Sequence, residues 1–249
     1  MRLLSAEILK LRRRRGLMIW CSLLTIGSVV VAYGVMLALH AANPAHHGPA
    51  GGVNNLQNMM WLLISLGTVA AAILGTTAGS QDVSAGVFRD LVVTGRSRRT
   101  LFRVRFPGAL AVFAPMLAVA YGLAVGGAYA FAGGLAAPTL HQVASYGLSA
   151  ALLCAVTLAA AVSLGAILPA RVATGVLIGW NAIIAGLLVA IPNLGHARDA
   201  IDVAAAAHFA PALYKDTVPM SAGTAVIVLV MWVAVALRAG TWWTKRLDA

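Results

Sequence analysis

The amino-acid sequence predicts an all-α, polytopic membrane protein with six transmembrane helices, and three observations lead to this fold class. Hydrophobic residues form 61% of the chain and charged residues only 10%, with a mean hydropathy of +0.88, whereas a soluble domain carries roughly 25% charged residues. The apolar residues fall in six runs, each close to the ~20 residues that cross a bilayer as a helix. Lys and Arg gather between alternate runs. Six spans with short loops use nearly all of the 249 residues, so we expect a single transmembrane domain over 1–249.

The first expected element is an amphipathic helix over residues 1–16. Its apolar side holds Leu4, Ile8 and Leu11, and its charged side holds Glu7, Lys10 and Arg14. Such a helix lies in the headgroup layer of a membrane, where its basic residues contact lipid phosphates. The basic run that anchors it is Arg12, Arg13, Arg14 and Arg15. The alternative is a charged topology anchor with no further role.

The six spans are expected at 17–39, 56–78, 106–132, 143–168, 172–191 and 220–237. None of these runs contains Asp, Glu, Lys or Arg, and breaks that contain Gly, Pro or Asn separate them. The first run exceeds the 7–15 apolar residues of a cleavable signal peptide, so we expect it to be retained. Cys21 and Cys154 fall inside apolar runs and are interpreted as small core hydrophobes rather than a disulfide.

The distribution of basic residues predicts that both termini lie in the cytoplasm. All of the 18 Lys and Arg residues except Arg198 and Lys215 fall on the side of the N-terminus. Loops rich in Lys and Arg remain on the cytoplasmic side of a membrane. The net charge of +11 is therefore expected to face the anionic inner leaflet, and no nucleic-acid partner is expected.

The segment between spans two and three contains a candidate amphipathic helix. Val83, Val87 and Leu91 share one helical side. Gly95 is expected to end this helix, and Ser97 to cap a second helix that leads into span three. A solvated connector is the alternative interpretation.

This segment and the surrounding layout resemble the permease subunits of type 2 ABC transporters. Those permeases have an amphipathic elbow helix, six spans, and a loop after span two with an acidic residue, an apolar helix and a Ser-Arg stop. Asp82, Gly86, Leu91, Ser97 and Arg98 fall on matching positions. Asp82 stands where Glu is more typical, and Gly95 stands where Pro is common. The opening residues, 6–11, also look like the family's N-terminus.

The resemblance implies a coupling helix that docks in a groove of a separate ATPase subunit. The residues implied in that contact are Asp82, Ser84, Gly86, Val87, Arg89, Asp90, Leu91, Ser97 and Arg98. Two copies of the ATPase, which hold ATP and Mg, would drive two permease chains, identical or related. The resemblance further implies a bacterial plasma-membrane exporter of an unidentified amphipathic substrate, with no cofactor or metal in this chain.

The sequence lacks the residues that several kinds of enzyme require. The three lysines follow Leu9, Tyr214 and Thr244, so the phosphate loop G-x-x-x-x-G-K-[ST] is excluded. Glu7 is the only glutamate, which excludes an H-E-x-x-H zinc site. Spans without charge also disfavour ion-coupled transport and favour an attached motor. The alternative function is a non-transporting membrane sensor or scaffold that recruits a cytoplasmic partner through its basic loop.

Four features of the predicted spans and outer side have two interpretations each. Asn181, in span five, either lines a substrate path or bridges two helices. The outer loop over 193–219 forms either the re-entrant hairpin that the resemblance implies or a packed surface helix. The outer histidines are solvated loop residues or metal ligands, and the first is favoured because a site needs three or four convergent ligands. Paired glycines permit close helix packing within the chain or between copies; the pairs are Gly75 and Gly79, Gly122 and Gly126, and Gly175 and Gly179.

Overall fold

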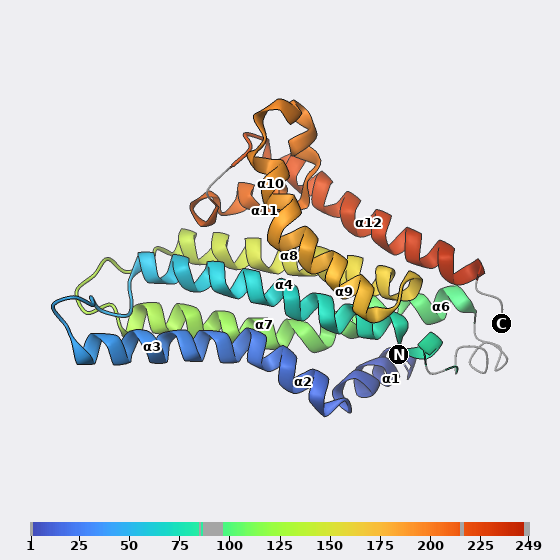
Figure 1. The fold of residues 1–249 in the computed structure, drawn as a ribbon, viewed down its shortest axis with the longest axis horizontal. Helices are drawn as coiled ribbons and strands as arrows, with labels where there is room; N and C mark the ends of the chain where they lie inside the picture. The colour runs from blue at the N-terminus through green and yellow to red at the C-terminus, as the bar shows by residue number, and fades with distance from the viewer. Residues whose placement is uncertain (1, 85, 87–96, 215–216, 247–249) are drawn as a thin grey trace.

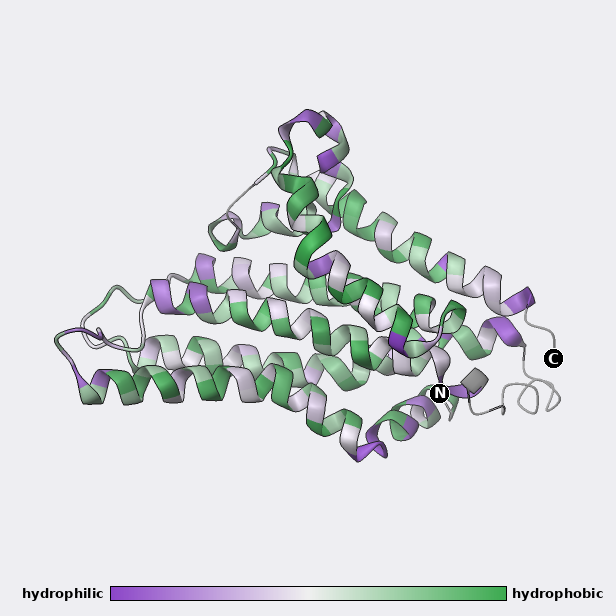
Figure 2. Cartoon of the chain, viewed as in Figure 1, coloured by the Kyte–Doolittle hydropathy of each residue, from purple (hydrophilic) through white to green (hydrophobic). Residues whose placement is uncertain are grey.

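A computed structural model (Figure 1) describes residues 2–84, 86, 97–214 and 217–246. Every regular element in these ranges is a helix. Six helical stretches are long and apolar enough to cross a membrane, which confirms the predicted class of multi-pass helical membrane protein. Figure 2 shows hydrophobic residues along the bodies of these helices and hydrophilic residues concentrated at their ends and in the connecting segments.

The chain begins with helix α1 (Arg2–Arg12), which precedes the first membrane-spanning stretch. The six stretches comprise α2 (Arg15–Ser22), η1 (Leu23–Gly27) and α3 (Ser28–Ala42); α4 (Val53–Ser84); α6 (Arg98–Arg103) and α7 (Arg105–Ala130); α8 (Leu140–Ile167); α9 (Ala170–Gly179), η2 (Trp180–Ile184) and α10 (Ala185–Ala190); and α12 (Ala222–Arg246). Between the last two stretches lie η3 (Pro192–Ala200), α11 (Asp202–Phe209) and η4 (Pro211–Leu213). These three short helices lie in the segment that the sequence predicts to face outward, and we call them the outer hairpin.

Two helices extend well beyond the apolar runs that predict them. α4 continues past Ala78 to Ser84, and α12 continues past Leu237 to Arg246. Hydropathy marks only the apolar part of a helix, whereas the helix continues as long as its i to i−4 backbone hydrogen bonds do. The extension of α4 carries Asp82 as part of the helix, which the predicted span does not include.

α4 and α8 form the centre of the bundle. Of the most apolar window in each, 67% is buried, compared with 17% in the first and sixth stretches. Their backbones meet, because a side chain at Gly79 would collide with the carbonyl oxygen of Val162 and one at Gly165 would collide with the backbone of Thr76. The Gly75 and Gly79 pair therefore serves packing within the chain.

The other two glycine pairs make no such contact. A Cβ placed at Gly122, Gly126, Gly175 or Gly179 meets no atom within 4 Å. These two pairs therefore face open space in the described part of the chain, and helix packing within it does not require them.

The peripheral first and fifth stretches each contain a π-helical turn, η1 and η2. Single π turns inside α-helices occur often at functional sites. In Figure 1, α3, α7, α4 and α8 lie side by side, while α9, α10 and α12 slope away from this layer toward the outer hairpin. α11 contacts α8, α10 and α12, so the hairpin fills the space where the fifth and sixth stretches diverge from the central helices.

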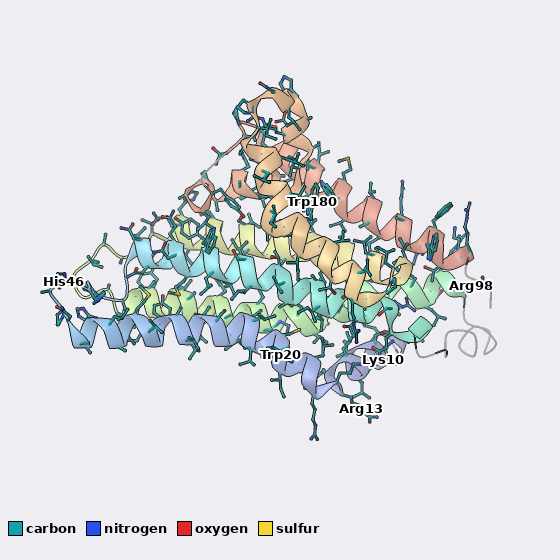
Figure 3. All side chains as sticks on the ribbon, viewed as in Figure 1. Lys10, Arg13, Trp20, His46, Arg98 and Trp180 are labelled. Carbon is teal, nitrogen blue, oxygen red and sulfur yellow. The ribbon has the colours of Figure 1, made fainter. Side chains whose placement is uncertain are left out.

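The two ends of the bundle differ in the elements that they expose. Figure 3 places Lys10 and Arg98 at one end, with α1, α6 and the end of α12, and His46 at the opposite end. The first helix and the C-terminal end of the last described helix thus lie at the same end of the bundle, as an even number of membrane crossings predicts.

Candidate functional site

Four charged residues come together where α1, α4 and α7 meet, and we call them the base cluster: Glu7, Lys10, Asp82 and Arg105. Lys10 Nζ lies 2.7 Å from the Glu7 carboxylate and 2.9 Å from Oδ1 of Asp82. Nη2 of Arg105 lies 2.9 Å from the other oxygen of Asp82, Oδ2. Asp82 on α4 thus joins the N-terminal helix to the start of α7.

Helical spacing explains how these side chains meet. Gly79 and Asp82 lie one turn apart on α4 and share a face, and Arg105 binds both, since its Nη1 donates to the Gly79 carbonyl at 2.7 Å. α1 approaches α7 closely at Gly108, where a Cβ would lie 2.9 Å from Cβ of Glu7. The small residue at position 108 therefore places the charged side of α1 against the bundle.

Burial makes the base cluster a strong constraint. Arg105 is completely buried and Asp82 is 4% exposed. Charges leave water at a large cost, which only good pairing and additional hydrogen bonds offset, and removal of one partner leaves the other buried and uncompensated. The bonds of Arg105 to both Asp82 and Gly79 meet this requirement, so α4 and α7 are held in one relative position.

Lys10 occupies a different environment from the one expected for it. The sequence places it on the charged side of the first helix, facing lipid headgroups, whereas in the structure it faces Asp82. The acid at the end of α4 explains the difference, because a buried carboxylate attracts the nearest available cation.

The basic run after α1 lies at the surface. Arg12, Arg13, Arg14 and Arg15 are exposed, and Figure 3 shows Arg13 pointing away from the bundle. Arg14 donates to the side-chain oxygen of Gln81, with its Nη2 at 3.2 Å, in the amide orientation that satisfies Gln81. The run is therefore positioned beside the end of α4.

The 83–97 segment, where the sequence places the contact with a partner, is described only at its two flanks. Ser84 is the last residue of α4, and Gly86 has a φ of +71°, a left-handed conformation that glycine adopts without strain. Val87, Arg89, Asp90 and Leu91 lie outside the described residues. Ser97 caps α6 as predicted, because its side chain accepts a hydrogen bond from the backbone N–H of Thr100.

The end of the 83–97 segment is fastened to α12. Arg98 Nη1 donates to the carbonyl of Lys245 at 3.0 Å, and cations are favourable near a helix C-terminus. Phe102 on α6 is buried against Gly240, where a side chain would collide with its ring. The start of the segment is thus held by α1 and α7, and its end is held by the sixth stretch.

Asn181 bridges two helices and also lines a cavity. Thr157 on α8 donates to Asn181 Oδ1 at 3.4 Å, and Asn181 Nδ2 donates to the Leu177 carbonyl. The cavity has a volume of about 360 Å³ and lies between α4, the fifth stretch and the outer hairpin. We call it the central cavity. Its walls are mostly apolar, with the polar side chains of Ser65, Thr68, Asn181 and Tyr214.

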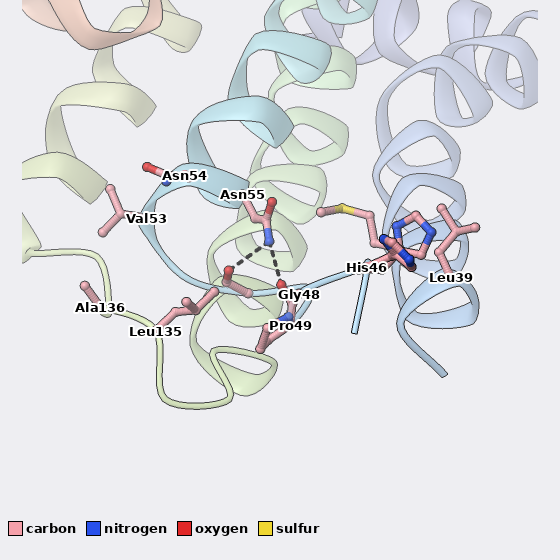
Figure 4. Close-up of a pocket in the computed structure, with 12 residues that line it drawn as sticks. Leu39, His46, Gly48, Pro49, Val53, Asn54, Asn55, Leu135 and Ala136 are labelled. Carbon is pink, nitrogen blue, oxygen red and sulfur yellow. Dashed lines mark hydrogen bonds between the residues drawn. The ribbon is translucent and has the colours of Figure 1, made fainter. Parts of the chain in front are cut away.

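A second pocket lies at the end of the bundle opposite α1, under the loop after α3 (Figure 4). It has a volume of about 530 Å³, and His46 and His47 form part of its wall. Asn55 fixes this loop, since Nδ2 donates to the carbonyls of Pro49 and Gly51, each at 2.9 Å. Within the described ranges, no three His, Cys, Asp or Glu side chains come together as a metal site would require.

The base cluster and the setting of Asp202 are not anticipated from the sequence. In the sequence, Arg105 contributes only to the prediction of membrane orientation. Its position along the chain does not indicate that it lies near Lys10. Asp202 is 3% exposed and accepts a hydrogen bond from Trp180 Nε1 at 3.1 Å. A lone acid next to an alanine run is the one signal that could have marked it.

No protein-family model matches the chain, and no curated protein matches its sequence. Its function is therefore inferred from its residues and their geometry.

Proposed function

We propose that this chain is the membrane-spanning permease subunit of a bacterial ATP-driven ABC exporter. It works as a dimer with an identical or related permease chain, in the plasma membrane, with both termini in the cytoplasm. Two separate ATPase subunits bind ATP and Mg and receive a coupling helix in the segment between α4 and α6. The residues proposed to contact them are those that the resemblance implies from Ser84 to Arg98, whereas Asp82, which is 4% exposed, holds this segment to the bundle.

The base cluster is the observation that carries this proposal. A partner that pushes on the 83–97 segment acts on two anchored flanks. Asp82 passes the displacement to α1 and α7 through its ion pairs with Lys10 and Arg105, and Arg98 passes it to α12. Packed helices with fixed contacts move as units, so a local push reorients several membrane-spanning stretches together.

Two further features fit an exporter of an amphipathic molecule. α1 is the elbow helix of this scheme and lies in the headgroup layer, anchored by Arg12, Arg13 and Arg15, which are exposed beside the bundle end. The central cavity of about 360 Å³ falls in the range of small-molecule sites, and apolar walls with a few polar groups are typical of them. Asn181 is proposed to line the translocation pathway from this cavity.

The test is co-purification and transport with an ATPase encoded by a neighbouring reading frame. We expect a stable complex whose ATP hydrolysis in vesicles rises with an exported amphiphile. Asp82→Asn should abolish this stimulation while the complex still forms, and Asp199→Asn, on the outer hairpin, should leave it unchanged. A chain that never associates with the ATPase, or that works without nucleotide hydrolysis, contradicts the proposal.

A second candidate function is a membrane sensor or scaffold, favoured by the four consecutive exposed arginines at 12–15. Such a protein would bind a cytoplasmic partner through the basic residues of this face. The same vesicles distinguish the two functions, because a scaffold binds its partner without moving a solute or stimulating ATP hydrolysis.

A further inference from the structure

Asp202 is a buried carboxylate that pairs with no cation in the part of the chain that the structure describes. It is 3% exposed at the start of α11. The nearest cation along the chain, Arg198, donates instead to the carbonyls of Gly195 and Val189. Burial raises the pKa of the Asp202 carboxyl, because desolvation outweighs its hydrogen bonds. An isolated buried charge of this kind is costly and is normally paired.

The hydrogen bonds of Asp202 do not explain why this residue is charged. Trp180 Nε1 and the backbone N–H of Val203 both donate to its Oδ1, at 3.1 and 2.9 Å. An asparagine side-chain oxygen could accept both bonds. Apart from the first turn of α11, which favours a negative charge modestly, the described residues give this charge no partner.

The carboxylate lies at a cavity that also presents two indole rings. This cavity has a volume of about 190 Å³, and Asp202, Trp180 and Trp232 form part of its wall. The two rings pack against each other, with centroids 5.5 Å apart, and Trp232 is fixed by donating to the carbonyl of Ala200 at 2.8 Å. Figure 3 shows Trp180 where the fifth stretch approaches α12. A carboxylate beside tryptophan rings is the environment that binds organic ammonium ions.

Apart from the side chains of Thr157 and Asn181, the rest of the cavity wall is an apolar groove that extends from this end. On α8 it is lined by Val156, Ala160 and Leu164, and on α9 by Val176 and Leu177. Val156 and Leu164 are eight residues apart, which is about 12 Å along a helix axis. The groove runs along helices that cross the membrane, so it can hold a hydrocarbon chain.

We propose that this cavity binds a cationic amphiphile, with its ammonium head between Asp202 and the two indole rings and its single apolar tail along α8 and α9. The cavity shares Leu177 and Asn181 with the central cavity, but the site needs no ATPase partner. Its test uses the purified chain alone, so it remains, or fails, independently of the proposed function. A bound cation also favours the ionised carboxylate, which removes the cost of the unpaired charge.

The ligand's ammonium group can come from a free amphiphile or from a lipid headgroup. A zwitterionic lipid carries a phosphate next to its ammonium, and that phosphate would be repelled by Asp202. The test therefore includes probes of both kinds.

The experiment measures binding to the purified chain in maltoside micelles by equilibrium dialysis. The probe is decyltrimethylammonium. Decyldimethylamine oxide, of similar shape but no net charge at neutral pH, corrects for partition into the micelle. Decylphosphocholine presents the same trimethylammonium head beside a phosphate. We expect saturable binding of the cation that exceeds binding of the amine oxide by about tenfold or more.

Two variants assign the binding to this site. Asp202→Asn keeps both hydrogen bonds and should weaken binding of the cation by about tenfold or more. Asp199→Asn removes a carboxylate that pairs with exposed His196 on the same hairpin and should leave binding unchanged. Trp232→Phe keeps an aromatic ring and should weaken binding less than Asp202→Asn does.

Each outcome either overturns the proposal or identifies the source of the ligand. Equal binding of the cation by wild type and Asp202→Asn, or equal binding of the cation and the amine oxide, overturns the proposal. Binding of decylphosphocholine as tight as that of the cation, lost in Asp202→Asn, assigns the site to lipid headgroups. Binding of decyltrimethylammonium alone assigns it to free amphiphiles.

Discussion

The base cluster and the outer hairpin are held in place by opposite kinds of interaction. At the base, one buried carboxylate, Asp82, pairs with two cations from separate helices. At the outer hairpin, four consecutive buried alanines, Ala204 to Ala207, pack against the neighbouring helices, with neutral hydrogen bonds such as Ser149 Oγ to the Ala206 carbonyl at 2.9 Å.

This difference predicts how easily the helices at each end of the molecule can change their relative positions. A buried ion pair is lost as a whole, at a cost of several kcal/mol, so the base keeps its geometry under load. Neutral hydrogen bonds contribute about 1 kcal/mol each, and alanine contacts are small, so the hairpin can shift in steps. A rigid base and a yielding outer hairpin fit the proposed permease, in which an ATPase pushes on the base.

The largest effect is expected from loss of Arg105. Arg105→Ala leaves Asp82 buried with Lys10 as its remaining cation, so the free energy of unfolding should fall by about 3–5 kcal/mol. Chemical unfolding in detergent measures this. Arg103→Ala, at an exposed position of α6, is the matched control. Equal stability of the two variants would mean that the buried pair contributes nothing.

Helix packing near the base provides the second prediction. Gly79→Val forces a side chain into the backbone of α8. It should lower the free energy of unfolding by about 1–3 kcal/mol or more, because an overpacked core is distorted. Gly122→Val, in open space, should change the unfolding midpoint little. A similar loss in both variants would indicate that Gly122 lies in a contact with another chain.

Lys10 tests the link between α1 and α4. Lys10→Met keeps the length of the side chain but removes its charge, and we expect a loss of about 1–2 kcal/mol, since a charged hydrogen bond is lost at a partly exposed site. Arg13→Met, on the exposed run, is the control. An unchanged midpoint for Lys10→Met would show that α1 is held by its apolar side alone.

At the outer hairpin, the loss of a single hydrogen bond should have a smaller effect on stability. Ser149→Ala removes the hydrogen bond to the Ala206 carbonyl and should cost about 1 kcal/mol. Ser145→Ala is the control, because the Ser145 hydroxyl donates to the Gln142 carbonyl within α8. A cost as large as that of Arg105→Ala would remove the contrast between the two ends.

The smallest expected effect, which has the opposite sign, comes from Asp202. Its pKa is raised in the folded chain, so the unfolded chain ionises at lower pH and stability falls as pH rises above the ordinary Asp range. Asp202→Asn should therefore stabilise the ligand-free protein slightly at neutral pH and not in acid. Thermal unfolding at both pH values measures this, and a variant less stable than wild type at neutral pH would show that the charge is already compensated.

The sequence predicts the spans better than it predicts the contacts between them. Runs without charge mark the helices because lipid excludes unpaired polar groups, and the Ser97 cap follows from local chemistry. The pairing of Lys10, Asp82 and Arg105 depends instead on tertiary packing, and hydropathy treats charges only as the ends of spans. The π turns at η1 and η2 likewise carry no local pattern.

The most direct test of this account is hydrogen exchange measured on wild type and Asp82→Asn in the same detergent. The account predicts faster exchange in α1 and at the start of α7, which Asp82 joins through Lys10 and Arg105, with unchanged protection in α11. Unchanged exchange in α1 and at the start of α7, or loss of protection spread evenly into the outer hairpin, would contradict it.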